Sequence, residues 1–340
     1  MKLVRTEEAV GHILCHDMTQ IIPGEYKGAR FRKGHVVTEE DIPVLLSMGK
    51  EHLYILELAP GMVHEDDAAQ QLRALAQGRN IRAGEDVREG KIELFAAADG
   101  YFTVDTERLY AVNFVPEVMM ATRKGGCAVR GGDKLAGMRV IPLAVPQSTL
   151  EAAAHAAGPE PLLNVYPFQL KHAGIITTGS EVKSGLVEDR FTPAVKQKLL
   201  DFGIETTAQI FSGDGVENVA IAINQIRTRG VDLVLCTGGM SVDPDDNTPG
   251  GIRAAGAKIV TYGAPVLPGA MFLLGYFSDG VPVLGLPGCV MFAGATVFDL
   301  VLPKIAAGFP VSREEILRLG EGGLCLGCSP CHWPDCPFGK

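Results

Sequence analysis

The residues best suited to chemistry lie in one loop, LCTGGMSVDPDDNTPGG, which covers Leu235–Gly251 and follows an apolar run. Its two adjacent glycines permit unusual torsions or the close approach of a ligand, and Ser241 adds a hydroxyl donor. Asp243, Asp245 and Asp246 are like charges that repel one another, so a cation or a set of hydrogen-bond donors must stabilise them. The loop therefore predicts an anion site that includes a metal ion.

Two other loops carry similar residues. The segment TTGSEVKSGLVEDR offers groups for a phosphate or a cation at Gly179, Ser180, Glu181 and Asp189. The segment FSGDGVEN places Asp214 beside two glycines at the start of a helix. Each loop alone is also typical of a polar surface turn with an ordinary helix cap.

The elements around these loops alternate between strands and helices. The runs HAGIITT, IETTAQIF and VDLVLCT suit buried strands, and FTPAVKQKLLDFG and VENVAIAINQIRTRG have apolar residues at helical spacing. Such an order predicts a mostly parallel sheet covered on both faces, whose ligands bind where the carboxyl ends of the strands meet helix N-termini. All three loops follow such strands, so we expect them to converge.

Further elements are expected downstream. AKIVTYG and VPVLGLPG suit strands, and a long apolar helix is expected from about Cys289 to Ala307. Thr248 and Pro249 are expected to be the N-cap and the first residue of another helix.

The chain is expected to belong to the α/β fold class and to contain four regions. They are a β-rich N-terminal unit at 1–60, a mixed helix and β region at 61–160, a three-layer α/β domain at 169–310 and a cysteine-rich tail at 320–340.

Six segments of the chain resemble one known family. GIITTGSEV, GLVEDR, GDGVENVAIAI, DLVLCTGGMSVDPDDNTP, VLPGAMF and GLPGCV occur in the order found in the molybdopterin-binding domain shared by molybdopterin molybdotransferases and molybdopterin adenylyltransferases. The resemblance covers about Lys171–Gly308, and the 61–160 region more weakly resembles the molybdotransferase N-terminal region. It implies a three-layer domain that binds the pterin phosphate at the strand ends, with Mg²⁺ assisting.

The resemblance also implies roles for individual residues. It assigns cofactor binding to a set of strand-end residues: Thr178, Gly179, Ser180, Glu181, Gly238, Gly239, Ser241, Pro287 and Gly288. It assigns catalysis to three carboxylates, Asp189, Asp214 and Asp246, of which Asp246 is the strongest candidate. Glycine N–H groups and helix ends suit a phosphate, and carboxylates can position a metal that neutralises oxyanions.

Three positions depart from the molybdotransferase pattern. Ser180 replaces an aspartate, Ala270 replaces a lysine, and Cys289 with Val290 replaces an asparagine-proline pair. Loss of a lysine weakens the expectation of molybdate insertion more than that of pterin binding. The DPDDNTP stretch is closer to the adenylyltransferases, so the loop combines features of both families.

Four cysteines crowd the C-terminus in a C-x2-C-x2-C pattern followed by one more after four residues: Cys325, Cys328, Cys331 and Cys336. Four thiolates can surround one Zn²⁺, which would order a tail with few apolar residues. An iron–sulfur cluster is the alternative, because Cys336 precedes Pro337 as in ferredoxin runs. Free thiols or a disulfide pair also remain open.

The overall charge narrows the classes of partner. A net charge of -9 argues against a broad nucleic-acid or anionic-membrane surface.

Neither a signal peptide nor an apolar run of about 18 residues is present, so a cytoplasmic protein is expected. The resemblance implies molybdopterin or its adenylylated form and molybdate as ligands, and a homodimer; a molybdoenzyme is a further candidate partner.

Several functions remain open at this point. The first is molybdenum cofactor biosynthesis by Mg²⁺-assisted transfer of molybdate to free or adenylylated molybdopterin. The second is a non-catalytic molybdopterin carrier or sensor. The others are a molybdopterin adenylyltransferase and a nucleotide pyrophosphatase, since GG followed by DD and TP also resembles the competence-damage type of nucleotide hydrolase.

Overall fold

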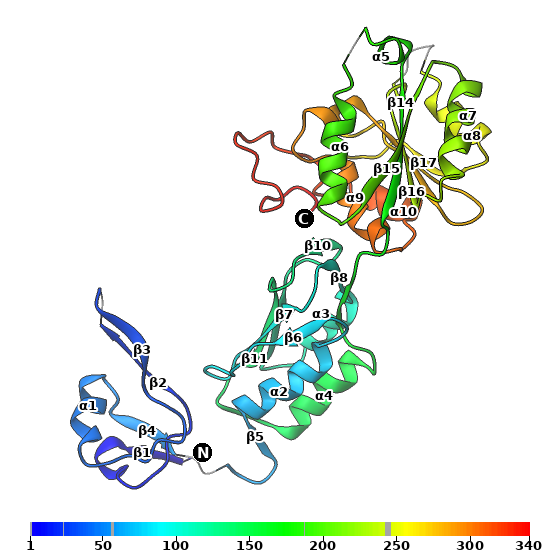
Figure 1. Ribbon diagram of the computed structural model, residues 1–340. Coiled ribbons are helices and arrows are strands. Elements are labelled where there is room, and N and C mark those ends of the chain that lie inside the picture. Colours follow the sequence, from blue (N-terminus) through cyan, green and yellow to red (C-terminus); the bar gives the residue numbers. More distant parts are fainter. Residues whose placement is uncertain (1, 23, 56–57, 187, 242–245) are drawn as a thin grey trace. The chain divides into compact units, whose positions relative to one another are not determined.

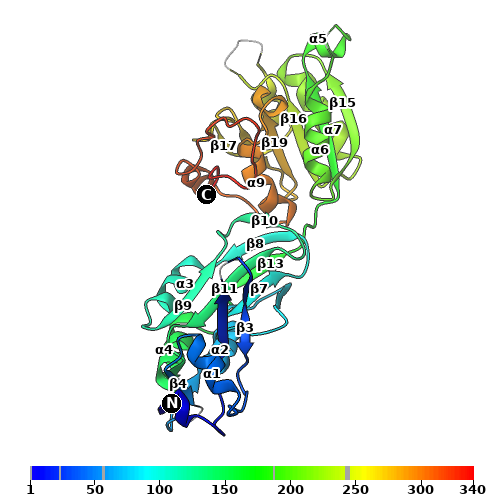
Figure 2. The same ribbon diagram turned by 90° about the vertical axis from the view of Figure 1, so that its left-hand side faces the viewer.

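The computed structural model describes residues 2–22, 24–55, 58–186, 188–241 and 246–340. The chain divides into two compact units. Unit 1 comprises Met1–Gly125 and Val129–Val165, and unit 2 comprises Gly126–Ala128 and Tyr166–Lys340. Figures 1 and 2 show the elements of each unit from two directions. Within the described ranges, no helix is long and apolar enough to cross a membrane.

Unit 1 begins with a small β-rich region. Its elements are β1 (Lys2–Arg5), η1 (Thr6–Glu8), β2 (Met18–Ile22), β3 (Tyr26–Phe31), α1 (Asp41–Ser47) and β4 (His52–Ile55). Strand β1 pairs antiparallel with β4, and β2 pairs with β3 as a hairpin. Buried Leu14, Phe31 and Leu45 form part of one hydrophobic core, which holds these short elements together.

The rest of unit 1 packs helices on antiparallel strands. Its elements are β5 (Met62–His64), α2 (Glu65–Ala76), β6 (Ile81–Ala83), β7 (Ile92–Ala96), β8 (Gly100–Val104), α3 (Thr106–Asn113), β9 (Val118–Thr122), β11 (Lys134–Val140), β12 (Ala144–Pro146), α4 (Gln147–Ala157) and β13 (Leu163–Tyr166). Strand β10 (Cys127–Val129) falls at the division between the two units. Four of the strands form one sheet in the order β6-β7-β11-β9.

Unit 2 is built on a six-stranded sheet in the order β15-β14-β16-β19-β18-β17. Its elements are β14 (His172–Thr178), α5 (Ser180–Lys183), α6 (Phe191–Leu200), β15 (Glu205–Ser212), α7 (Val216–Arg227), β16 (Leu233–Thr237), α8 (Thr248–Ala254), β17 (Lys258–Tyr262), β18 (Leu273–Tyr276), β19 (Pro282–Leu286), η2 (Gly288–Met291), α9 (Val297–Ala306) and α10 (Arg313–Arg318). Strands β14, β15, β16 and β19 are parallel, and β18 is antiparallel to both neighbours. The expected α/β class with a mostly parallel sheet is confirmed.

Both faces of this sheet are buried, each against its own hydrophobic core. Successive strand residues point to opposite faces of the sheet. Ile175 of β14 lies in one core with Val195 of α6 and Val301 of α9. The next residue, Ile176, lies in another core with Ile223 of α7 and Ile252 of α8. The sheet is therefore the middle of three layers, with α6 and α7 on opposite faces (Figure 1).

Two expectations for unit 2 are wrong. The long helix expected from Cys289 to Ala307 is broken into η2 and α9. Thr296 and Asp299 form a capping box that starts α9, so local capping overrides the continuous apolar pattern. Thr248 is the first residue of α8, and Asn247 precedes it as the N-cap.

Candidate functional site

The carboxyl ends of the parallel strands form one edge of unit 2, where the sequence placed its unusual loops. Strands β14 and β15 end in register at Thr178 and Ser212, and β14 and β16 pair up to Thr177 and Thr237. The loops that follow these strands therefore start side by side. Such an edge is where open α/β sheets bind their ligands.

Three threonines and one glycine tie the β14 and β16 loops together. The Thr178 hydroxyl donates to the Thr237 carbonyl oxygen at 3.1 Å and lies 3.2 Å from the Thr248 hydroxyl. Thr248 in turn donates to the Gly238 carbonyl oxygen at 2.9 Å. Thr178 and Thr248 are 6% and 1% exposed, so this network fixes the base of the loop from inside.

The two adjacent glycines are required by this packing. Gly238 has φ +87°, and a Cβ there would lie 2.7 Å from the Thr178 carbonyl oxygen. Gly239 has φ +57°, and a Cβ there would lie 2.7 Å from the Thr248 hydroxyl oxygen. Any side chain would displace the loop.

A tyrosine from the edge strand holds the next part of the loop. The Tyr262 hydroxyl lies 3.0 Å from the Met240 carbonyl oxygen and 3.3 Å from that of Ser241, so it can donate to either. Partial burial raises the pKa of Tyr262, and the negative charge of Asp246 raises it further. Asp246 therefore lies near the anchored end of the loop, whereas Asp243 and Asp245 fall outside the described residues.

The β14 and β15 loops are joined by a reciprocal pair. The Ser180 backbone N–H donates to the Asp214 carboxylate at 3.1 Å, and the Asp214 N–H donates to the Ser180 hydroxyl at 3.5 Å. Gly179 precedes α5 with φ +128°. Glu181 lies in α5, but its side chain is outside the described part of the chain. Asp214 is thus already engaged in positioning Ser180.

Asp189 occupies a helix-capping position. One of its carboxylate oxygens accepts from the backbone N–H groups of Phe191 and Thr192 at 3.0 and 3.1 Å. The other accepts from the Thr192 hydroxyl, from Gln209 at 2.9 Å and from Thr177 at 3.3 Å. This donor set satisfies the carboxylate, so Asp189 positions the start of α6 and the loop before it.

The last predicted segment lies after β19. Pro287 precedes η2 and is half-buried, whereas Gly288 is exposed. A Cβ on Gly288 would meet only the Phe191 ring, at 3.9 Å, so packing does not require glycine there. Burial raises the pKa of the neighbouring Cys289 thiol, and the charge of Asp299 raises it further.

Sequence reasoning missed three residues that shape this edge. Thr248 was expected only to cap a helix, Tyr262 only to end a strand, and Gln209 had no assigned role. Their contacts join residues far apart in the sequence: 70 residues separate Thr248 from Thr178, 22 separate Tyr262 from Met240, and 20 separate Gln209 from Asp189. Alternation along β15 could have indicated that Gln209 faces one side of the sheet, but not its partners.

The four tail cysteines are not gathered in this structure. Within the described residues, no group of three or more His, Cys, Asp or Glu side chains could hold a metal ion. Cys325 and Cys336 pack against the core of unit 2, and Cys328 and Cys331 are exposed. Metal binding by these four cysteines therefore stays a prediction.

Apolar packing gives the tail an order of its own. Phe338 is 2% exposed and lies in the core with Phe298 and Val301. Trp333 packs edge-on against Phe338 with ring centroids 5.6 Å apart. The tail backbone also pairs with the loop after β17, since Leu267 donates to Gly323 and Cys325 donates to Leu267, each at 2.8 Å.

The burial of the thiols predicts their order of reaction. A thiol-specific reagent at pH 8 is expected to modify Cys328 and Cys331 first and to leave Cys236 intact in the native protein. Complete burial raises the pKa of Cys236 to about 12, which suppresses its thiolate. Peptide mass spectrometry over time measures the order. Early modification of Cys236 would contradict the described packing.

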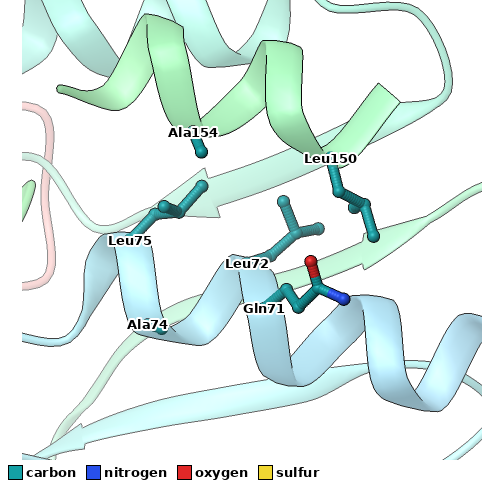
Figure 3. A pocket seen from close by; sticks show the side chains of 6 residues that line it. All are labelled: Gln71, Leu72, Ala74, Leu75, Leu150 and Ala154. Carbon is teal, nitrogen blue, oxygen red and sulfur yellow. The ribbon is translucent and has the colours of Figure 1, made fainter. Parts of the chain in front are cut away.

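A pocket lies in unit 1 between α2 and α4 (Figure 3). It has a volume of about 240 Å³ and is lined by Gln71, Leu72, Ala74, Leu75, Leu150 and Ala154. None of these side chains is titratable, and Gln71 is the single polar one in the lining. The hollow offers no acid, base or nucleophile.

Comparison with known families matches two segments. Residues 174–307 match the family described as "Probable molybdopterin binding domain". Residues 3–57 match a domain of unknown function (DUF8806). The first match contains the strands and loops of the candidate edge.

Particular relatives are similar over smaller parts. A CinA-like protein of Mycobacterium sp. (strain JLS) is 37% identical over 76 residues, and one of Mycobacterium avium (strain 104) is 34% identical over 76 residues. Each match spans 22% of this chain and 18% of the relative, about a fifth of its length.

Two solved structures are also similar. The molybdopterin biosynthesis enzyme MoaB from Thermus thermophilus is 21% identical, with 42% of this chain and 99% of that chain covered and a TM-score of 0.35. The molybdopterin biosynthesis MoeA protein from Pyrococcus horikoshii is 17% identical, with 72% and 79% covered and a TM-score of 0.34.

Proposed function

We propose that unit 2 binds molybdopterin at the carboxyl edge of its sheet and acts in molybdenum cofactor biosynthesis, by Mg²⁺-assisted transfer of molybdate to free or adenylylated molybdopterin. The main support is the convergence of three loops: the threonine network joins the β14 and β16 loops, and the Ser180–Asp214 pair joins the β14 and β15 loops. This is the edge of the domain matched over residues 174–307.

Each residue has a separate task in this proposal. The backbone around Gly179, Gly238 and Gly239 approaches the pterin phosphate, because glycine leaves its N–H groups accessible. Ser180 and Ser241 donate hydroxyl hydrogen bonds, and Pro287 with Gly288 bounds the far side of the ligand. Thr178 and Asp189 act as positioning residues, since their polar atoms are already bonded within the protein.

The described carboxylates suit a metal that the ligand helps to hold. Mg²⁺ is commonly bound by one or two carboxylates together with substrate phosphates. Five donors engage both carboxylate oxygens of Asp189, whereas Asp214 accepts from Ser180 through one oxygen, so Asp214 would hold the metal together with Asp246. When bound, the metal would neutralise developing charge on oxyanions.

Replacement of Asp246 by alanine tests this role. We expect Asp246→Ala to abolish Mg²⁺-dependent turnover of adenylylated molybdopterin, because a carboxylate proposed to hold the metal is lost. Asp201→Ala removes an exposed charge just after α6 and serves as the control. Unchanged Mg²⁺-dependent turnover in Asp246→Ala would remove Asp246 from the mechanism.

A non-catalytic carrier or sensor is the second candidate. Ala270 in place of the lysine of the molybdotransferases favours it, as does the use of Asp189 in helix capping. Tight binding of molybdopterin without conversion of its adenylylated form would support this candidate.

A nucleotide pyrophosphatase is the third candidate, and the similarity to CinA-like proteins favours it over the adenylyltransferase. Hydrolysis of ADP-ribose by the purified protein would support it. Absence of hydrolysis together with pterin binding would favour the first two functions.

A further inference from the structure

Unit 2 contains a pocket that none of the assigned pterin residues lines. It lies along the edge strand β17 and has a volume of about 560 Å³, within the range of small-molecule sites. Its wall consists of Arg253 from α8, Arg313 and Leu317 from α10, and the stretch Ile259–Pro265.

The charged groups of this pocket are all cationic. Arg253 and Arg313 line it, and no carboxylate does among the described residues. This is unusual for a chain with a net charge of -9. A local positive field attracts anionic ligands.

The two glutamates of α10 next to Arg313 pair with other cations. Glu314 pairs with Arg318 at 2.7 Å, and Glu315 pairs with Lys304. Within the described residues, neither Arg253 nor Arg313 has an ion-pair partner. Among the described residues, both guanidinium groups therefore keep donors for a ligand.

The remaining wall suits an organic group beside the anion. Ile259, Val260 and Leu317 provide apolar surface, and Leu317 is 44% exposed. Tyr262 is 39% exposed, and its ring provides a flat face. The Tyr262 hydroxyl also holds the loop after β16, which links this pocket to the pterin edge.

We propose that this pocket binds a phosphorylated small molecule, with its phosphate held between Arg253 and Arg313 and its organic part against Tyr262 and Leu317. Guanidinium groups bind phosphate through paired, charge-assisted hydrogen bonds. The proposal does not depend on pterin binding, because the two sites share no assigned residue.

Binding of phenyl phosphate to the full chain tests the proposal by calorimetry. We expect saturable binding that weakens as salt is added, and at least about a tenfold loss of affinity in Arg253→Ala and in Arg313→Ala. Arg229→Ala removes an exposed arginine after α7 and should change the affinity less than about twofold.

The probes separate the sources of the anion. Inorganic phosphate should bind more weakly than phenyl phosphate but lose affinity in the same two variants, whereas phenol should not bind. Equal affinity of all variants for phenyl phosphate, absence of saturable binding, or equal binding of phenol would overturn the proposal. Equal affinity for phosphate and phenyl phosphate would also overturn it, in favour of a site for the free anion. Retention of pterin by Arg253→Ala would separate this result from the pterin site.

Discussion

Replacing Gly238 by alanine is expected to weaken molybdopterin binding by about a hundredfold while unit 2 stays folded. The new Cβ would lie 2.7 Å from the Thr178 carbonyl oxygen and 2.8 Å from its hydroxyl. Since the first of these atoms belongs to the backbone of β14, the loop after β16 must move away. We expect the free energy of unfolding to fall by about 1–3 kcal/mol.

Gly230→Ala is the matched control for this change. Gly230 also has a positive φ, +71°, but a Cβ there would meet nothing within 4 Å. The control therefore carries the backbone strain without the contact at Thr178. Binding titrations and denaturant unfolding of both variants measure the effect. Equal pterin affinity in Gly238→Ala and Gly230→Ala would show that the loop does not form the site.

Phe338→Ala is expected to destabilise unit 2 by about 3–5 kcal/mol, because truncating a buried phenylalanine leaves a cavity. Phe338 lies in the main core although it is two residues from the end of the sequence given. The change also removes the contact with Trp333. Thermal unfolding should show a Tm about 10 °C lower.

Leu326→Ala provides the comparison in the same tail. Leu326 is 72% exposed, so its loss should change stability by less than about 0.5 kcal/mol. The pair of variants tests what orders the tail. If a chelator unfolds the tail and Phe338→Ala does not, a metal ion orders it and apolar packing does not.

Metal binding by the four tail cysteines remains a proposal, which rests on their spacing in the sequence. Their spacing suits Zn²⁺ or an iron–sulfur cluster, whereas the described side chains are not gathered around a common point. Cys325 and Cys336 pack against the core, whereas Cys328 and Cys331 are exposed. The thiol-labelling order, measured with and without Zn²⁺, distinguishes the two arrangements.

The sheet of unit 2 was largely predictable because its signals are local. The run HAGIITT becomes β14 at His172–Thr178, and α6 and α7 lie within their predicted segments. An apolar run bounded by turns fixes a buried strand without knowledge of its neighbours. The break before α9 was missed because an apolar helix pattern continued across a capping box.

The site was only partly predictable, since its contacts are not local. The sequence indicated that Gly238 and Gly239 allow close approach, but the atoms they approach belong to Thr178 and Thr248. Asp189 was expected in catalysis from a motif, yet its five donors come from α6, β14 and β15. Such partners depend on strand order, which periodicity does not specify.

The central claim is that the carboxyl edge of unit 2 binds molybdopterin. Its most direct measurement is the amount of pterin that the protein retains after anaerobic incubation with molybdopterin and gel filtration, quantified by fluorescence after oxidation. We expect stoichiometric retention by the unmodified protein and by Gly230→Ala, and little by Gly238→Ala. No retained pterin in any of the three would contradict the account.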